Sequence, residues 1–196
     1  MSRTVKILFA AAVALGLSQG AKAHPHVFVY TGFVPVAEDG RLVAVETSWS
    51  FDPLYSEMVM ADADTDGDGV LSEAEQAALT AVFFADLPDY DFLTRVGIDG
   101  VWHGISEADG FWVNGRDGIL RAGFTLQLDL PVESTVELMS FDDEYFIAFQ
   151  PDEGSVEMAG ASADWQCEVR RYDLESWYFG PVVSDGLACE RIGSTS

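Results

Sequence analysis

The sequence predicts an α+β protein, an antiparallel β-sandwich or twisted sheet that carries an inserted helix–EF-hand loop–helix unit. Three observations lead to this prediction. Short stretches of alternating apolar and polar residues recur along the chain between Gly, Asp and Pro, as in antiparallel strands. Two stretches with helical spacing lie together after the second predicted strand. A twelve-residue acidic loop connects those two helices.

The first 23 residues have the three parts of a secretory signal peptide. Arg3 and Lys6 come first, an apolar run over 7–17 follows, and Ala21-Lys22-Ala23 forms a small-x-small cleavage site. The apolar run is much shorter than the ~20 residues that a membrane-spanning helix needs. We therefore predict cleavage after Ala23, export to the periplasm, and a single domain over residues 24–196 that does not span a membrane.

The domain is expected to begin with a β-hairpin. Residues 26–36 and 42–51 alternate in polarity on either side of Glu38-Asp39-Gly40, a turn sequence. Pro53 is well placed to begin a helix over 53–63, and a second helical stretch covers 72–87, so the insert spans about 53–87. Further strands are expected at 92–98, 101–105, 111–115, 119–130, 134–141, 144–149, 155–159 and 164–172.

The charge balance excludes one class of partner. The chain has 33 acidic and 10 basic residues, with a formal net charge of −23. A surface this negative repels nucleic acid and anionic membranes, and it concentrates cations. We expect no nucleic-acid partner.

The cysteine count predicts one disulfide. Cys167 and Cys189 are the only cysteines, and an exported chain meets an oxidising compartment. Their bond would fix the C-terminal tail to the domain. A Cys-based metal or redox site is disfavoured because the chain has no CxxC motif.

The loop DTDGDGVLSEAE, residues 64–75, matches the twelve-position EF-hand calcium loop. Acidic residues occupy positions 1, 3 and 5, a glycine occupies position 6 where the chain bends sharply, and helical patterns flank both ends. The alternative is a solvated acidic loop. The expected Ca²⁺ ligands are Asp64, Asp66, Asp68, the carbonyl of Val70, Ser72 and Glu75. With no second loop in the sequence, we expect a structural role for this calcium.

Two of the three histidines stand at the predicted mature N-terminus. His24 would bring its ring and its α-amino group, and His26 would lie on the same face of an extended strand. Such a nitrogen-rich set suits zinc, copper or nickel. Pro25 has no amide hydrogen, so a copper site built on deprotonated backbone amides is excluded. Asp52 and His103 are additional candidate ligands, and a frayed terminus that binds nothing is the alternative.

Several motifs in the same order resemble a bacterial periplasmic family. They are HPHVFV at 24–29, WSFDPLYS at 49–56, DTDGDG at 64–69, YDF at 90–92 and FDDEYFIAF at 141–149. Members of this family are often labelled substrate-binding components of ABC-type transport systems, and they include the zinc-uptake accessory protein ZevA. The resemblance implies a partner permease in the membrane and a divalent transition metal, zinc first. The chain lacks the long His-rich acidic tract of many periplasmic metal carriers, which favours a single defined site.

Three functions follow as hypotheses. The first is a periplasmic metal-binding accessory protein of a transport system for zinc, or for nickel, cobalt or copper, with a structural calcium site. The second is a calcium-stabilised structural or adaptor module whose histidines have no metal role. The third is a copper enzyme that uses an N-terminal histidine. Because the sequence contains no GxSxG, phosphate-loop or HExxH motif, we expect that the protein is not an enzyme.

Overall fold

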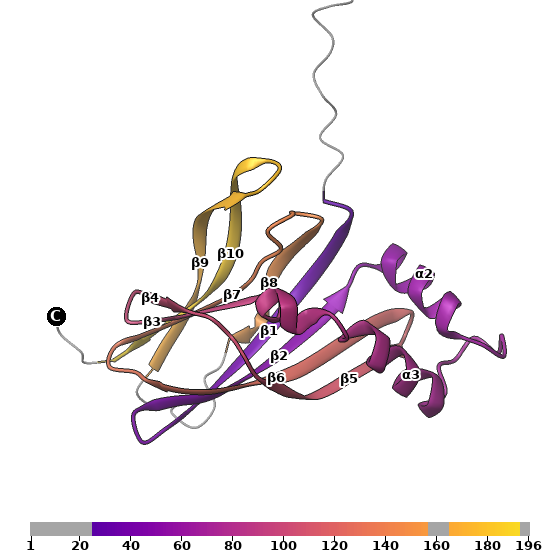
Figure 1. The fold of residues 1–196 in the computed structure, drawn as a ribbon, viewed down its shortest axis with the longest axis horizontal. Coiled ribbons are helices and arrows are strands. Elements are labelled where there is room, and N and C mark those ends of the chain that lie inside the picture. The colour runs from indigo at the N-terminus through magenta and orange to yellow at the C-terminus, as the bar shows by residue number, and fades with distance from the viewer. Residues whose placement is uncertain (1–24, 157–164, 193–196) are drawn as a thin grey trace, which may run out of the picture.

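The computed structural model describes residues 25–156 and 165–192, and it confirms the α+β class. The described elements are ten strands in two five-stranded sheets, two α-helices and one 3-10 helix (Figure 1). The predicted signal peptide and His24 lie outside the described residues. None of the helices in the described ranges is long and apolar enough to cross a membrane.

The first sheet contains the predicted N-terminal hairpin. Its order is β5–β6–β2–β1–β8, with bounds β1 Val27–Glu38, β2 Arg41–Phe51, β5 Ala108–Arg116, β6 Ile119–Pro131 and β8 Ile147–Val156. Glu38 pairs with Arg41, so Asp39 and Gly40 form a two-residue turn. Both have positive φ, 49° and 76°, which defines the turn type that suits the twist of paired strands. The hairpin prediction is confirmed.

The second sheet has the order β4–β3–β7–β10–β9, with bounds β3 Thr94–Ile98, β4 Val101–His103, β7 Thr135–Ser140, β9 Trp165–Ser176 and β10 Gly180–Arg191. Asp99, in the turn between β3 and β4, binds the segment that leads into β7. Its carboxylate accepts hydrogen bonds from the backbone N–H groups of Glu133, Ser134 and Thr135 at 2.8 to 2.9 Å. One aspartate thus closes the end of this sheet.

Both sheets contribute to one hydrophobic core. Phe33, Val45 and Phe124 from the first sheet belong to the same buried cluster as Val136 and Leu138 from the second. Trp49 connects the two sheets directly, because its indole N–H donates to the buried hydroxyl of Ser140 at 3.3 Å. The alternation of buried and exposed residues along the strands therefore reflects one shared interior.

The pairing of β8 differs from the antiparallel arrangement that we predicted. β8 runs parallel to β1, with Val27 opposite Ile147 and Val29 opposite Phe149. A strand that returns to a sheet after a long excursion has no hairpin turn to impose antiparallel direction. The strand expected at 144–149 begins only at Ile147, and it continues through Pro151 to Val156, within the strand expected at 155–159; residues 157–159 lie outside the described range.

We did not predict the last strand, β10, although we correctly predicted the disulfide that joins it to β9. The sequence GPVVSDGLACER contains Pro, Gly and Asp, which weaken strand patterning. In the structure β10 lies between β7 and β9, so this segment is internal to the sheet. Cys189 pairs with Cys167 across the β9–β10 ladder and forms the disulfide with it. The bond therefore joins two neighbouring strands, whereas we expected it to tie down a tail.

The second predicted helix is shorter than expected. It ends at Phe83 instead of Leu87, and the 3-10 helix η1 Leu87–Leu93 follows. Three consecutive residues, Asp91, Phe92 and Leu93, have φ values of 49°, 54° and 48°. This left-handed turn, which is costly for residues other than glycine, redirects the chain into β3. We predicted Phe92 and Leu93 as the first residues of a strand, but they belong to this turn, and the strand begins at Thr94.

Candidate metal centre

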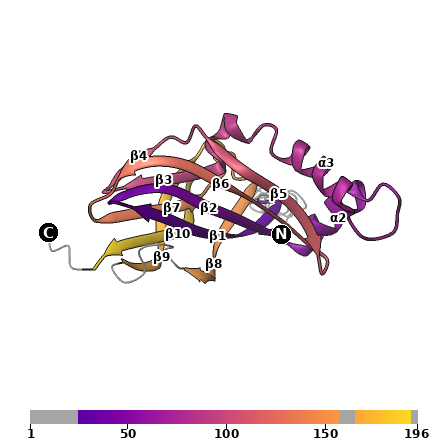
Figure 2. The same ribbon diagram turned by 90° about the horizontal axis from the view of Figure 1, so that it is seen from below.

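Two helices, α2 Pro53–Ala63 and α3 Glu73–Phe83, form an arm at one end of the molecule (Figures 1 and 2). α2 begins after Asp52, whose side chain accepts a hydrogen bond from the Tyr55 N–H at 3.0 Å, and Pro53 occupies the first helical turn. α3 begins after Ser72, which forms a reciprocal capping box with Glu75. The acidic loop lies between these two capped helices.

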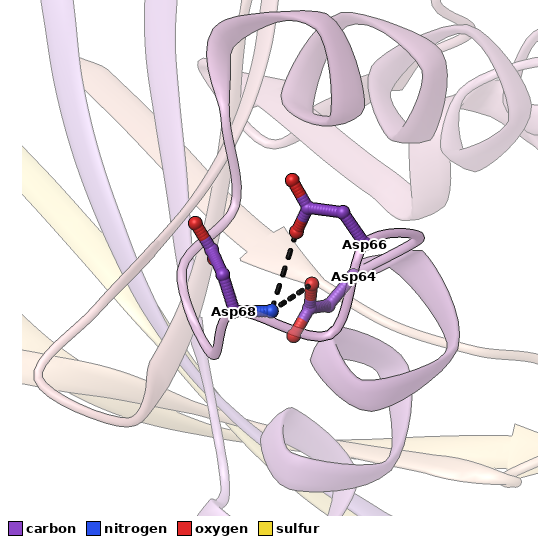
Figure 3. Close-up of side chains that lie close together, drawn as sticks. All are labelled: Asp64, Asp66 and Asp68. Atoms are coloured by element: carbon purple, nitrogen blue, oxygen red, sulfur yellow. Dashed lines mark hydrogen bonds between the residues drawn. The ribbon is translucent and has the colours of Figure 1, made fainter.

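Three carboxylates converge in this loop. Asp64, Asp66 and Asp68 each offer an oxygen, and these atoms lie within 4.8 Å of one another (Figure 3). In the ranges that the structure describes, no other group of three or more His, Cys, Asp or Glu residues is close enough to share one ion. The predicted alternation of inward side chains at loop positions 1, 3 and 5 is therefore present.

Backbone N–H groups hold these carboxylates in place. The two oxygens of Asp64 accept from the N–H groups of Gly67 and Gly69 at 2.8 Å, and Asp68 N–H donates to Asp64 and Asp66 at 3.2 Å (Figure 3). Gly67 and Gly69 have φ of 72° and 83°, a conformation that disfavours other residues. The loop therefore folds around the Asp64 side chain.

The electrostatics of the loop favour a cation. The hydrogen bond from the Asp68 backbone lowers the pKa of Asp66, but the charge of Asp68, partial desolvation, the charge of Glu75 and the Asp64 side chain together outweigh it, so the net pKa of Asp66 is raised. Like charges this close repel one another, and a bound cation would relieve the repulsion. Hard oxygen ligands in this number suit Ca²⁺ or Mg²⁺ better than softer metals.

Glu75, the predicted bidentate ligand, does not join the three aspartates. One of its oxygens accepts from the backbone N–H and the hydroxyl of Thr65, at 2.6 and 2.7 Å. The other accepts from the backbone N–H and the hydroxyl of Ser72, at 2.9 and 2.8 Å. The Thr65 hydroxyl and these further hydrogen bonds lower the pKa of Glu75 to about 2. The described geometry thus contains an acidic triad, and the complete six-ligand EF-hand site is not confirmed.

The remaining loop residues anchor the arm. Val70 donates its N–H to Asp68 at 2.8 Å and exposes its side chain. Leu71, the next residue, is buried. Gly115 of β5 lies so close to α2 that an added Cβ would meet the Met60 sulfur at 2.5 Å. Met60 of α2 and Leu71 therefore pack the arm against Gly115 of the first sheet.

Thr65 also belongs to this centre, although we did not predict it from the sequence. Position 2 of the loop is not a ligand position, so the motif gave no reason to single it out. The signal was its side chain: a hydroxyl within the acidic loop can donate to a carboxylate, which an apolar residue there could not do. Thr65 supplies two of the four hydrogen bonds that hold Glu75.

The predicted transition-metal residues fall in separate places. His24 lies outside the described residues. His26 is exposed, its N–H donates to the Phe146 carbonyl at 2.9 Å, and its ring lies 4.9 Å from the Phe146 ring. Asp52 lies beside the start of β1, as we predicted, and its second oxygen accepts the Phe28 N–H at 3.0 Å. His103 lies on β4, the edge strand of the other sheet.

Comparison with curated proteins finds no match to this chain. A family model described as "Protein of unknown function (DUF1007)" matches residues 9–175, which include the arm, the acidic loop and most of both sheets. The chain therefore belongs to the DUF1007 family.

Proposed function

We propose that the loop Asp64–Glu75 binds Ca²⁺ and that the protein is an exported metal-binding module stabilised by this ion. The observation that carries the proposal is the convergence of the Asp64, Asp66 and Asp68 oxygens within 4.8 Å, between two capped helices. The Cys167–Cys189 disulfide supports export, because disulfides persist in oxidising compartments.

Calcium coordination requires one rearrangement of the described geometry. The three aspartates and the Val70 carbonyl supply oxygens from the loop, with Ser72 acting directly or through water. Glu75 must exchange its hydrogen bonds with Thr65 and Ser72 for the ion in order to supply two more. Its carboxylate is already ionised at neutral pH, so no proton has to leave. In this exchange the Glu75 carboxylate would lose hydrogen bonds from neutral donors and gain contact with a divalent cation.

The proposed role of the ion is to hold the arm in place. Hydrogen bonds attach both helices to the first sheet. The Thr80 hydroxyl accepts from Val113 N–H at 3.1 Å, and the Ser56 hydroxyl accepts from Leu120 N–H at 3.0 Å and donates to the Phe51 carbonyl at 3.3 Å. Mutual repulsion within the loop works against a fixed arm. A cation that neutralises these charges would stabilise the arm packed on the sheet relative to an arm detached from it.

Calorimetric titration of the chelator-treated mature protein with Ca²⁺, Mg²⁺ and Zn²⁺ tests the proposal. We expect one Ca²⁺ site that is lost in Asp64→Asn. Asp86→Asn is the matched control, because Asp86 lies outside the loop and its side chain makes no capping hydrogen bond. The proposal is contradicted if calcium addition gives no heat of binding, or if both variants lose calcium binding equally.

A second proposed function is that of a periplasmic accessory protein of a divalent transition-metal transporter. The family resemblance supports it, with zinc as the first metal and a membrane permease as the partner. The position of His26 also supports it, since a backbone hydrogen bond to Phe146 fixes this residue beside the sheet while its side chain stays exposed. His24 and His26 would be the ligands. Asp52 and His103 are weaker candidates, since Asp52 already accepts two backbone N–H groups and His103 lies on the other sheet.

A further inference from the structure

A groove of about 590 Å³ runs between the two helices of the arm. Its apolar lining comes from Val59 and Ala63 on α2 and from Ala74, Ala78, Leu79 and Val82 on α3. The α3 residues recur at positions i, i+4, i+5 and i+8, which describes one face of a helix. The groove therefore lies between one face of α3 and the C-terminal part of α2, and three of its six apolar residues are alanines.

The hydrogen bonds and the aromatic contact that hold the arm on the sheet come from residues outside the groove. On α3, Thr80 binds Val113 of β5 and Phe83 packs against Phe51. On α2, Ser56 binds Leu120 of β6. None of these three arm residues lines the groove. Val59 and Leu79 line the groove and also pack against the core, whereas Ala74, Ala78 and Val82 stay exposed, so the groove remains open on its outer side.

The arm exposes more apolar surface than its packing on the sheet requires. Val82, at one end of the groove, is 76% exposed, and Leu54 and Met58 of α2 are 78% and 57% exposed. Scattered apolar residues on a surface are ordinary, but here they accompany an open apolar groove. Such a combination is typical of a surface that is covered in a complex.

The charge around the groove is of one sign. Residues 53–93 contain ten acidic side chains and no lysine, arginine or histidine. Asp62 and Glu75 line the groove itself, and Glu57 and Glu73 are exposed on the same helices. This potential attracts a cationic partner and repels nucleic acid, anionic lipid and a second copy of this acidic chain.

We propose that the groove between α2 and α3 is the docking site for a cationic amphipathic α-helix of a partner protein. Helix-in-groove recognition places apolar side chains at i, i+3, i+4 and i+7 into such a channel. Alanines at 63, 74 and 78 let the partner backbone approach closely, while Asp62, which is exposed and lines the groove, attracts its lysine or arginine residues. On α3 the lining residues from Ala74 to Val82 extend over about 12 Å, which matches about two turns of the partner.

This inference does not depend on calcium binding, because the groove is present in the geometry described above. Measuring the interaction both with Ca²⁺ and with a chelator separates the two proposals. Binding in either condition supports docking, and only the calcium titration tests the loop.

The experiment uses a fluorophore-labelled leucine–lysine peptide of about four helical turns, with leucines at i, i+3, i+4 and i+7. Anisotropy titration of the mature protein should give saturable binding. Ala78→Lys/Val82→Lys should weaken it at least about tenfold, and Ala78→Trp, which fills the groove without changing charge, should weaken it similarly. The matched control Ala77→Lys/Ala81→Lys has the same charge and spacing on an exposed face outside the groove, and it should stay within about twofold.

Four results would overturn the proposal. The first is no binding in either condition. The second is equal weakening by the two double-lysine variants, which would mean that charge alone attracts the peptide. The third is equal affinity for a peptide of the same composition whose leucines and lysines alternate. The fourth is a dimer in sedimentation velocity that only the groove variants dissociate, which would make a second copy the occupant.

Discussion

The carboxylate of Glu75 is bound to Thr65 through two hydrogen bonds, one from the backbone N–H at 2.6 Å and one from the hydroxyl at 2.7 Å. This contact connects the last position of the acidic loop to its second position. It closes the loop through hydrogen bonds at the place where an EF-hand closes it through calcium. The Glu75 carboxylate can therefore either accept these hydrogen bonds or coordinate calcium, and the two states compete.

Calcium should stabilise the folded protein. At a free concentration of about 100 times Kd, a ligand that binds only the native state adds roughly 2.7 kcal/mol to the free energy of unfolding. Glu75→Gln should remove most of this gain, whereas Glu57→Gln, an equal charge change on exposed α2, should retain it. Urea unfolding with and without millimolar calcium measures both. An unchanged midpoint for the wild-type protein would refute the prediction.

Asp52 should contribute to stability as a cap whether or not it binds metal. Its two oxygens accept the N–H groups of Tyr55 and Phe28, each at 3.0 Å, so it joins the start of α2 to β1. Asp52→Ala should lower the free energy of unfolding by about 1–2 kcal/mol, and Asp52→Asn by less, since one acceptor remains. Chemical denaturation under chelating conditions makes the comparison. A loss that appears only when zinc is present would instead assign Asp52 as a ligand.

Asp99 should make stability depend on pH in acid. Burial opposes its ionisation, but backbone N–H groups of residues 133–135 and the Ser134 hydroxyl outweigh burial and lower its pKa to about 2. A folded-state pKa below the unfolded value gives stability that is present above the ordinary carboxyl range and is lost as pH falls from about 4 to about 2.

Asp99→Asn tests this dependence, because asparagine tolerates the φ of 49° at this position. The exposed side chain reduces the effect through solvent screening, so we expect the variant to be about 1 kcal/mol less stable at pH 7. The difference should shrink towards pH 2. Parallel unfolding curves for the two proteins across this range would contradict the assignment.

The predicted mature N-terminus should bind zinc or copper through the amine and ring of His24 and the ring of His26. An extra residue ahead of His24 keeps both rings but displaces the amine, so the affinity should fall, and His26→Ala should lower it further. Binding should weaken in acid because the nitrogen ligands must be unprotonated. Competition titration with a chromogenic chelator measures each affinity. Equal affinities in the three proteins would show that the histidines are incidental.

The local features of the fold were predictable because neighbouring residues determine them. The Asp39-Gly40 turn, the helix beginning at Pro53 and the inward alternation of Asp64, Asp66 and Asp68 each follow from a few consecutive residues. Cys167 and Cys189 could be paired because the chain has no other cysteine. These features required no knowledge of which strands become neighbours.

Features that depend on distant residues were not predictable in the same way. The parallel alignment of β8 with β1 arises from packing of the whole chain, and no pattern within residues 147–156 indicates its direction. The segment that forms β10 looked irregular because burial between β7 and β9 compensates for its weak strand propensity. The orientation of Glu75 toward Thr65 likewise depends on how the loop folds, which the motif does not specify.

The position of β1 has a consequence for the order in which the protein folds. β1 pairs with β2 as soon as that strand is made, but its other edge stays open until β8 arrives, and the Thr31 hydroxyl reaches the Gln150 carbonyl across 119 residues. Contacts so distant in sequence form slowly, because a long loop must close before they are gained. During synthesis the first sheet therefore remains incomplete until about three quarters of the chain has been made. For a chain that we propose is exported, this delay keeps one edge of β1 unpaired while translocation begins.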